Sequence, residues 1–463
     1  MMRGLLLLAV LAVCADAGAL APAPSEAVNY GLFGNLHLAR PAAASNAMVL
    51  QFSDADGWNA REESIAGAIA TQGALVVGID TPTYLKRLQA IDDKCSYPAG
   101  HVEEVAHWIA RHENIAQYSA PLVIGDGTGA SFAYAMSAQA PAGTFSGLVT
   151  LGWIEALRLG KPLCAGDAGA ITVADGAGKF RVAPLAAMPL PWWPRPFAPG
   201  ARSDGLGAWL AAVWRVTAWL CPMSASVDAA DDAARIWRDW QRQQSASAPA
   251  LPDDVADLPL TEVAPTTTAN GRVAILVTGD GGWAGLDRGV AEALAAQGVR
   301  VVGFSTLKFF WHTQTPQAAA DAIARVIAHY GKDAANTRFV LVGYSFGASL
   351  VPVILNRLPP ALRARIELGV MISPDDEAVF EIHVGDWFGS TQHEGALPLG
   401  PELARNATAL LCVHGADEDD SLCSKPLPAN VREASLPGGH HYDGDYAALG
   451  ALISRSLPAS TEP

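Results

Sequence analysis

The chain has 463 residues, of which 50% are hydrophobic and 17% charged, so it is long enough for two or three domains with sizeable cores. Its formal net charge of −15 argues against nucleic-acid binding, which needs clustered lysine and arginine. The same charge gives no general attraction to an anionic membrane, whereas a cationic substrate or lipid would suit it.

The N-terminus has the pattern of a secretory signal peptide over residues 1–21. Arg3 precedes a short apolar run at residues 5–13, and small residues follow it. The run is shorter than the roughly 20 residues that span a bilayer. A lipidated Cys14 is an alternative, although Val13 stands where a small residue is expected. The mature protein is therefore expected to be exported.

An internal repeat organises the rest of the chain. Trp58 and Trp283 end two similar Asp-Gly loops, and the spacing between them recurs between Val76 and Val301. Three segment pairs match in the same order: VLQFSDADGW (49–58) with ILVTGDGGW (275–283), ALVVGID (74–80) with RVVGFS (300–305), and PLVIGDGTGASF (121–132) with FVLVGYSFGASL (339–350). Three ordered matches predict a duplicated domain.

Each copy alternates strands with helices, which predicts the α/β class with a mainly parallel sheet covered on both faces. An Ala, Ser and Pro-rich stretch at 245–256 is typical of a linker. We therefore expect two tandem α/β-hydrolase-like domains, at residues 28–244 and 257–463.

The first copy lacks catalytic groups. Gly127 stands where the second copy has Ser345, and no histidine occurs between His112 and His312. A glycine cannot act as a nucleophile. The first domain is therefore expected to be degenerate and to serve packing, substrate binding or partner binding.

In the second copy, a glycine-rich loop follows the first matched strand. Its glycines let the backbone approach a substrate, so the amides of Asp280 and Gly281 are candidate donors to an oxyanion. A plain tight turn is the competing interpretation.

Residues 343–347 read Gly-Tyr-Ser-Phe-Gly, a G-x-S-x-G motif between an apolar strand and a helical segment. This setting is typical of a nucleophile elbow, which lifts the serine hydroxyl above the carboxyl edge of the sheet. Ser345 is the predicted nucleophile, and the amide of Phe346 is the predicted second oxyanion donor.

The orienting acid is expected in the run Asp417-Glu418-Asp419-Asp420, because it follows a strand at residues 409–413. Only one carboxylate is needed to accept the imidazole N–H. Glu418 has the commoner spacing after the glycine. Asp420 lies beside Ser421 and a predicted disulfide that would hold it rigid, so Asp420 is favoured and Glu418 is the alternate.

The catalytic base is expected last, in the loop after the final predicted strand. His440 follows two glycines there and is favoured, with His441 as the alternate. The competing interpretation is a surface histidine with no catalytic part.

Cysteines also fit an exported chain, in which disulfides can form. Removal of Cys14 leaves five of the six cysteines, so at least one stays unpaired. Cys412 with Cys423 is the favoured pair and Cys164 with Cys221 the second, while buried free thiols remain an alternative. No spacing resembles a zinc site, and no metal or other cofactor is predicted.

Five segments together resemble the VirJ/AcvB family of bacterial exported proteins. They are TGDGGWAGLD (278–287), FSTLKFFW (304–311), GYSFGAS (343–349), DEDDSLC (417–423) and LPGGHHYDGDY (436–446). The resemblance covers residues 257–463 closely, and the long two-copy form is similar to the AcvB branch.

The resemblance implies a periplasmic serine hydrolase, linked to virulence and type IV secretion, that releases lysine from lysyl-phosphatidylglycerol. Ser345 would attack the lysyl carbonyl with His440 as base. Asp280, Asp375 and Asp376 are candidates to attract the ammonium groups of the lipid. Alternatives are another serine esterase or thioesterase, a non-catalytic binding protein of type IV secretion, and a metal-dependent hydrolase.

Overall fold

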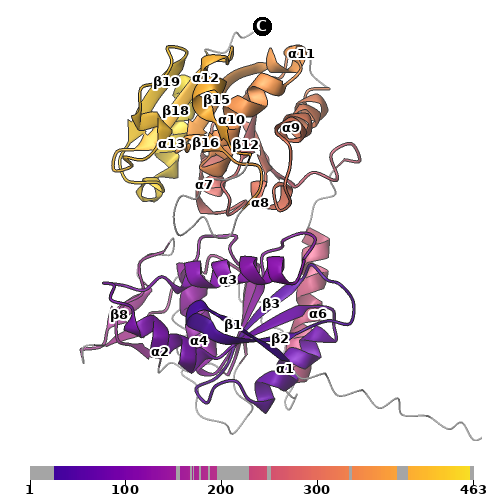
Figure 1. Ribbon diagram of the computed structural model, residues 1–463, viewed down its shortest axis with the longest axis vertical. Coiled ribbons are helices and arrows are strands. Elements are labelled where there is room, and N and C mark those ends of the chain that lie inside the picture. Colours follow the sequence, from indigo (N-terminus) through magenta and orange to yellow (C-terminus); the bar gives the residue numbers. More distant parts are fainter. Residues whose placement is uncertain are drawn as a thin grey trace, which may run out of the picture.

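The computed structural model shows two α/β domains, one above the other in Figure 1. It describes residues 25–152, 157–166, 169, 171–176, 179–185, 188–195, 229–247, 252–332, 336–382 and 395–458. The predicted signal peptide and Cys221 lie outside these ranges. Among the helices within them, none is long and apolar enough to cross a membrane.

The first domain is built on a seven-stranded sheet of order β1-β2-β4-β3-β5-β6-β10. Strands β3 to β6 and β10 are parallel, while β1 and β2 form an antiparallel hairpin at one edge. The strands are β1 (Glu26–Tyr30), β2 (Gly34–Ala39), β3 (Met48–Phe52), β4 (Leu75–Ile79), β5 (Leu122–Asp126), β6 (Gly147–Leu151) and β10 (Trp192–Arg195). The helices are α1 (Ala60–Ala70), α2 (Thr81–Ala90), α3 (Pro98–His112), α4 (Thr128–Gln139) and α6 (Ala229–Ser247). A small sheet of β7 (Arg158–Leu159), β8 (Thr172–Ala174) and β9 (Phe180–Val182) lies beside it.

The second domain has a seven-stranded sheet of order β11-β13-β12-β14-β15-β18-β19, in which only the edge strand β11 is antiparallel. The strands are β11 (Leu260–Val263), β12 (Arg272–Val277), β13 (Arg300–Phe304), β14 (Arg338–Tyr344), β15 (Ile366–Ile372), β18 (Leu410–Gly415) and β19 (Val431–Leu436). A short hairpin pairs β16 (Glu377–Ala378) with β17 (Leu397–Pro398). The helices are α7 (Gly285–Ala295), α8 (Thr306–Phe309), α9 (Pro316–Tyr330), α10 (Phe346–Arg357), α11 (Pro360–Arg363), α12 (Leu399–Ala404) and α13 (Tyr446–Ser456). Continuous apolar strands such as β14 are buried, as parallel strands covered on both faces should be.

The two sheets confirm the predicted fold class and the duplication. In each domain a glycine of the second matched strand faces the ring of the loop tryptophan. A Cβ atom added to Gly78 would lie 2.1 Å from Trp58, and one added to Gly303 would lie 2.1 Å from Trp283. The same close approach of ring and backbone is therefore kept in both copies.

Residues of both domains lie within the predicted linker, residues 245–256. Helix α6 reaches Ser247 and packs against α1 in the first domain. On the other side, Val255 is buried, and Arg325 of the second domain donates to the backbone carbonyl of Asp254 over 2.8 Å. The second domain therefore begins with residues that were expected in the linker.

The disulfides match one of the two predicted pairs. Cys412 and Cys423 are bonded, as expected. Cys164 is bonded to Cys95, so its predicted pairing with Cys221 is wrong. The reason is a backbone contact between two segments far apart in the chain: the amide of Cys164 donates to the carbonyl of Ser96 over 2.9 Å.

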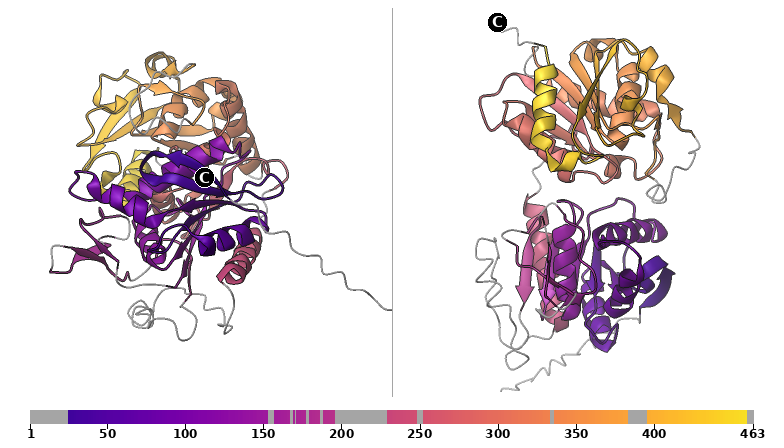
Figure 2. Two further views of the ribbon diagram at one scale, coloured as in Figure 1. Left: turned by 60° about the horizontal axis from the view of Figure 1, so that its bottom comes forward. Right: turned by 90° about the vertical axis from the view of Figure 1, so that its left-hand side faces the viewer.

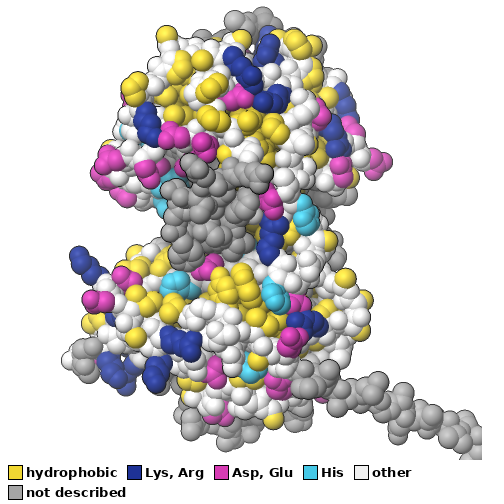
Figure 3. All heavy atoms as spheres, viewed as in Figure 1, with side chains coloured by type: hydrophobic (Ala, Val, Ile, Leu, Met, Phe, Trp, Pro, Cys, Tyr) yellow, Lys and Arg dark blue, Asp and Glu magenta, His cyan; other side chains and the backbone are white. Residues whose placement is uncertain are grey.

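The domains stack with the amino edge of the first sheet toward the carboxyl edge of the second (Figures 1 and 2). Trp311, which follows α8, donates its indole N–H to the carbonyl of Ile115, which precedes β5, over 2.9 Å. A Cβ on Gly143, which precedes β6, would lie 2.6 Å from the carbonyl oxygen of Trp283. On the face in Figure 3, basic, acidic and histidine side chains lie at the waist between the domains.

Candidate active site

Ser345 lies at a sharp turn between β14 and α10. Its backbone has φ 50° and ψ −117°, a conformation that side chains rarely adopt. Its amide donates to the carbonyl of Ile372 over 2.8 Å, which fixes the turn against β15. The strand–turn–helix setting predicted from the motif is therefore present.

Two glycines make this turn sterically feasible. A Cβ on Gly347 would lie 2.2 Å from the carbonyl oxygen of Val277, and one on Gly343 would lie 2.3 Å from that of Gly347. Both obstacles are backbone atoms, which cannot move aside as a flexible side chain would. The helix thus packs directly against the end of β12.

We expect Gly347→Ala to lower the free energy of unfolding by about 1–3 kcal/mol, the usual cost of overpacking, and to reduce activity by displacing the elbow. Chemical denaturation would measure the first effect. Gly400→Ala is the matched control, because Gly400 is helical and a Cβ there meets no atom within 4 Å. Equal stability of Gly347→Ala and the wild type would contradict this explanation.

The structure brings His440 to Ser345. Its Nε2 lies 3.1 Å from the Oγ of Ser345, and its Nδ1 lies 2.6 Å from Oε1 of Glu418. This is the arrangement of nucleophile, base and orienting acid that activates a serine. His441 instead places its Nδ1 2.9 Å from the hydroxyl of Tyr344.

The prediction that Asp420 orients the imidazole is wrong, and the alternate, Glu418, takes that position. Glu418 is 8% exposed. It also accepts hydrogen bonds from the Ser373 hydroxyl (2.7 Å) and the Gly415 amide (3.1 Å). A turn closed by the Glu418 amide and the Gly415 carbonyl directs this side chain inward, whereas Asp420 is exposed to solvent.

The Glu418 carboxylate and the His440 imidazole each favour the charged form of the other. Burial raises the pKa of Glu418, but hydrogen bonds from His440, Ser373 and the Gly415 amide outweigh it and hold that pKa below its usual value. Burial lowers the pKa of His440, but the hydrogen bond and charge of Glu418, with the charges of Asp375 and Asp280, raise it overall.

We therefore expect ester hydrolysis to increase with pH as His440 loses its proton, with a midpoint above the usual histidine value of 6.5. A neutral ester substrate, which does not titrate, would give the kcat/KM profile. Glu418→Gln should move the midpoint to lower pH, because the hydrogen bond and charge of Glu418, the largest of the effects that raise the pKa of His440, are then lost while burial still lowers it. His441→Gln should leave the midpoint in place. An unchanged midpoint in Glu418→Gln would contradict the assignment.

The first domain has a turn with the backbone geometry of the elbow but with no nucleophilic side chain. Gly127 has φ 52° and ψ −113°, almost the angles of Ser345. The Oδ1 atom of Asp54 accepts the amides of Ala55 and Thr128, each over 2.7 Å. These two amides correspond in the repeat to those of Asp280 and Phe346. A carboxylate oxygen thus lies where an oxyanion would bind.

This internal comparison favours the amides of Phe346 and Asp280 as the oxyanion donors of the second domain. The amide of Gly281, the third candidate, donates to the Oδ1 of its neighbour Asp280 over 3.1 Å. In the first domain the site is closed, since a Cβ on Gly127 would lie 2.2 Å from the Cγ of Asp54.

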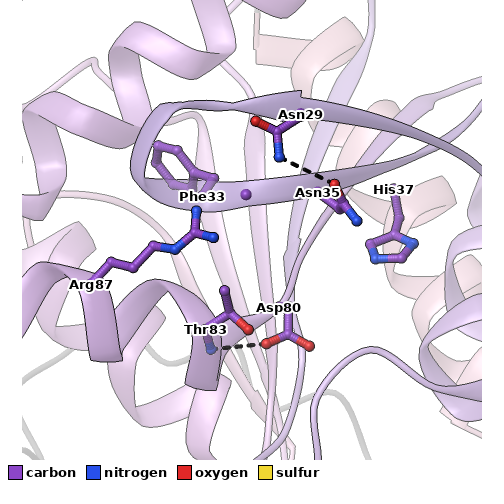
Figure 4. A pocket seen from close by; sticks show the side chains of 8 residues that line it. Asn29, Phe33, Asn35, His37, Asp80, Thr83 and Arg87 are labelled. Atoms are coloured by element: carbon purple, nitrogen blue, oxygen red, sulfur yellow. Dashed lines mark hydrogen bonds between the residues drawn. The ribbon is translucent and has the colours of Figure 1, made fainter.

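A separate cavity of about 360 Å³ lies in the first domain, between the β1–β2 hairpin and α2 (Figure 4). Its polar groups hold the fold together. Asp80 accepts the amides of Thr83 and Trp58, each over 2.9 Å, and Arg87 donates to the carbonyl of Gly31 over 3.2 Å. The described residues that line it include neither serine nor cysteine.

Besides Glu418, two further carboxylates act on His440. The charges of Asp375 and Asp280 both act on His440. The backbone amide of Asp375 donates to the Ser349 hydroxyl over 3.0 Å, which anchors this residue. Asp376 forms an ion pair with Lys425.

The sequence of the second domain matches a known family. Residues 271–460 match the family model described as bacterial virulence protein (VirJ). No curated protein matches the chain.

Several solved structures are similar to part of the chain. An alpha-beta serine hydrolase homologue from Coxiella burnetii is 16% identical, with 43% of this chain and 91% of that chain covered and a TM-score of 0.33. XC6422 from Xanthomonas campestris, an a/b serine hydrolase without lid, is 16% identical, with 46% and 100% covered and a TM-score of 0.31. Similarity at this level says nothing about substrates.

Proposed function

Because residues 271–460 belong to the VirJ family, we propose that the second domain is a serine hydrolase that cleaves the aminoacyl ester of lysyl-phosphatidylglycerol. The products are lysine and phosphatidylglycerol. The observation that carries the hydrolytic part is the contact of Ser345 with His440 and of His440 with Glu418.

In the proposed reaction, His440 takes the hydroxyl proton of Ser345 as the oxygen attacks the lysyl carbonyl carbon. The amides of Phe346 and Asp280 stabilise the oxyanion. The ester C–O bond then breaks, and His440 gives its proton to the glycerol oxygen, which leaves as phosphatidylglycerol. Water, deprotonated by His440, attacks the lysyl-enzyme, and lysine leaves as Ser345 regains its proton.

The choice of a lysyl ester is supported by the charge around the site. The lysyl group carries two ammonium groups, and Asp280 and Asp375 lie near enough to His440 for their charges to raise its pKa. Carboxylates in such a position attract a cation and repel an anionic lipid. The net charge of −15 agrees with a lipid whose headgroup is positive overall.

We place the reaction at the membrane surface of the periplasm, with components of type IV secretion as further candidate partners. The signal-like N-terminus supports export, and the two disulfides fit an oxidising compartment. The resemblance to the VirJ/AcvB family implies the link to secretion.

The test is lysine release from vesicles that contain lysyl-phosphatidylglycerol, with the mature protein and Ser345→Ala in parallel. We expect release by the wild type only. Cleavage of simple esters through Ser345 without release of lysine would favour another serine esterase or thioesterase. No cleavage of any ester would favour a non-catalytic secretion protein.

A further inference from the structure

The acid Glu418 is held by a chain of hydroxyl groups that begins in the loop of the base. One carboxylate oxygen, Oε1, contacts His440, and the other, Oε2, accepts the Ser373 hydroxyl over 2.7 Å. The Oγ atom of Ser373 lies 2.8 Å from the hydroxyl of Tyr442, which comes two residues after His440. The contacts therefore form a closed circuit that leaves the base loop at His440 and returns to it at Tyr442.

The chemistry of the acid fixes the direction of these hydrogen bonds. An ionised carboxylate can only accept, so the single hydroxyl proton of Ser373 is directed at Glu418. The oxygen of Ser373 then accepts the proton of Tyr442. The carbonyl of Val413, 3.2 Å from the Tyr442 hydroxyl, is a weaker competitor, because it already accepts the Ser373 amide over 2.7 Å. The donors thus run from Tyr442 through Ser373 into the acid.

Both hydroxyl groups are carried by strained, buried residues. Ser373 has φ 51° and Tyr442 has φ 52°, in the left-handed region that side chains rarely adopt. Each residue is 1% exposed. Such conformations persist only where the surrounding structure enforces them, and they concentrate at functional sites. Ser345 has the same kind of backbone conformation.

The circuit supplies what a glutamate needs in this position. Its side chain has one more rotatable bond than that of aspartate, so more conformational freedom must be removed to keep Oε1 on the imidazole. The acid and the base also come from different loops, after β18 and β19. Ser373, at the end of β15, holds the acid, and Tyr442 ties the base loop to the same point. The circuit therefore fixes the acid and the base relative to each other.

We propose that Ser373 and Tyr442 are positioning residues for the reaction, which hold the Glu418 carboxylate against His440 through a directed chain of two hydrogen bonds. Both are buried, so they act through the acid rather than on the substrate. The inference rests on the proposed hydrolase activity and applies to any ester that Ser345 cleaves.

The test is a double-mutant cycle of Ser373→Gly and Tyr442→Phe, measured on a neutral ester at a pH above the His440 midpoint. Glycine tolerates the backbone angles of Ser373, and phenylalanine keeps the ring of Tyr442. We expect Ser373→Gly to lower kcat by about 10- to 100-fold, the effect of losing a hydrogen bond to a charged group, and Tyr442→Phe by about threefold to tenfold, that of a neutral one. KM should not change. Because the chain runs through Ser373, the double variant should be no slower than Ser373→Gly alone.

Tyr134→Phe is the matched control, because Tyr134 is also buried and its hydroxyl accepts the Leu185 amide over 3.1 Å in the first domain. Thermal unfolding should show a loss of stability in Tyr134→Phe and in Tyr442→Phe, but only Tyr442→Phe should lower kcat. The inference is overturned if both site variants keep the wild-type kcat, if they raise KM at unchanged kcat, or if their effects multiply in the double variant. If Ser373→Gly does not fold, Tyr442→Phe decides alone through kcat and KM.

A readout without substrate separates this inference from the proposed activity. The proton between Nδ1 of His440 and the Glu418 carboxylate is expected to give a proton NMR resonance far downfield of the amides, because it lies in a short, charge-assisted hydrogen bond. If the wild type cleaves no ester, the proposed activity fails, whereas weakening of this resonance in both variants would still support the positioning chain. An unchanged resonance in both variants would overturn it.

Discussion

Ser345→Ala is expected to lower kcat for ester hydrolysis by about 10⁵–10⁶-fold, the effect of removing the nucleophile of a serine hydrolase. The elbow directs the hydroxyl of Ser345 toward His440, the base that would activate it. Steady-state kinetics on lysyl-phosphatidylglycerol and on a soluble ester would measure the loss.

The chain offers a matched control for this experiment. Gly127 of the first domain adopts the backbone angles of Ser345, so Ser345→Gly should be tolerated by the turn and should relieve its strain. We expect this variant to be as inactive as Ser345→Ala and at least as stable as the wild type. Activity of either variant above one-hundredth of the wild type would contradict Ser345 as the nucleophile.

Glu418→Gln is expected to lower kcat by about 10³–10⁴-fold, because an amide that replaces the orienting carboxylate favours the wrong tautomer of the base and cannot stabilise the imidazolium. The buried contact of Glu418 with Nδ1 of His440 is the reason. Kinetics with a neutral ester at a pH above the His440 midpoint would separate this effect from a shift of pKa.

Asp420→Asn provides the comparison, since Asp420 is exposed and lies in the same loop. We expect it to change kcat by less than about twofold, as for most surface substitutions. A larger loss in Asp420→Asn than in Glu418→Gln would mean that the loop rearranges when substrate binds and that the resting geometry misidentifies the acid.

The fold could be predicted because its signals are local and repeated. The apolar strand β14, the glycine-flanked Ser345 and the helix α10 follow one another in sequence, so a short window contains the whole elbow. His440 could also be placed, since it follows the last parallel strand, whose carboxyl end lies at the same edge of the sheet as Ser345.

The acid could not be chosen in the same way. The carboxylates of residues 417–420 are consecutive, and which one points inward depends on the turn after Gly415 and on Ser373 at the end of β15. The predicted disulfide at Cys412 and Cys423 is present, but its rigidity does not turn Asp420 toward the base. The commoner spacing of Glu418 after the glycine was the signal in the sequence that pointed to the carboxylate beside His440.

Contacts between distant segments were the hardest to foresee. The pairing of Cys95 with Cys164 depends on the backbone contact of two loops, for which the sequence has no periodic signal. Arg111 likewise resembles any surface residue of an amphipathic helix until the stacking of the domains places its guanidinium over the Trp311 ring. The position of the Asp54 carboxylate beside Gly127 also depends on the folded loop, so the sequence alone did not predict it.

The most direct test of the account is covalent labelling with a fluorophosphonate, followed by peptide mass spectrometry. The reagent reacts with a serine only when a neighbouring base activates it. We expect one adduct, on Ser345, that disappears in Ser345→Ala and is strongly reduced in His440→Ala. Absence of labelling in the folded wild type, or labelling that persists in Ser345→Ala, would contradict the assignment of the catalytic centre.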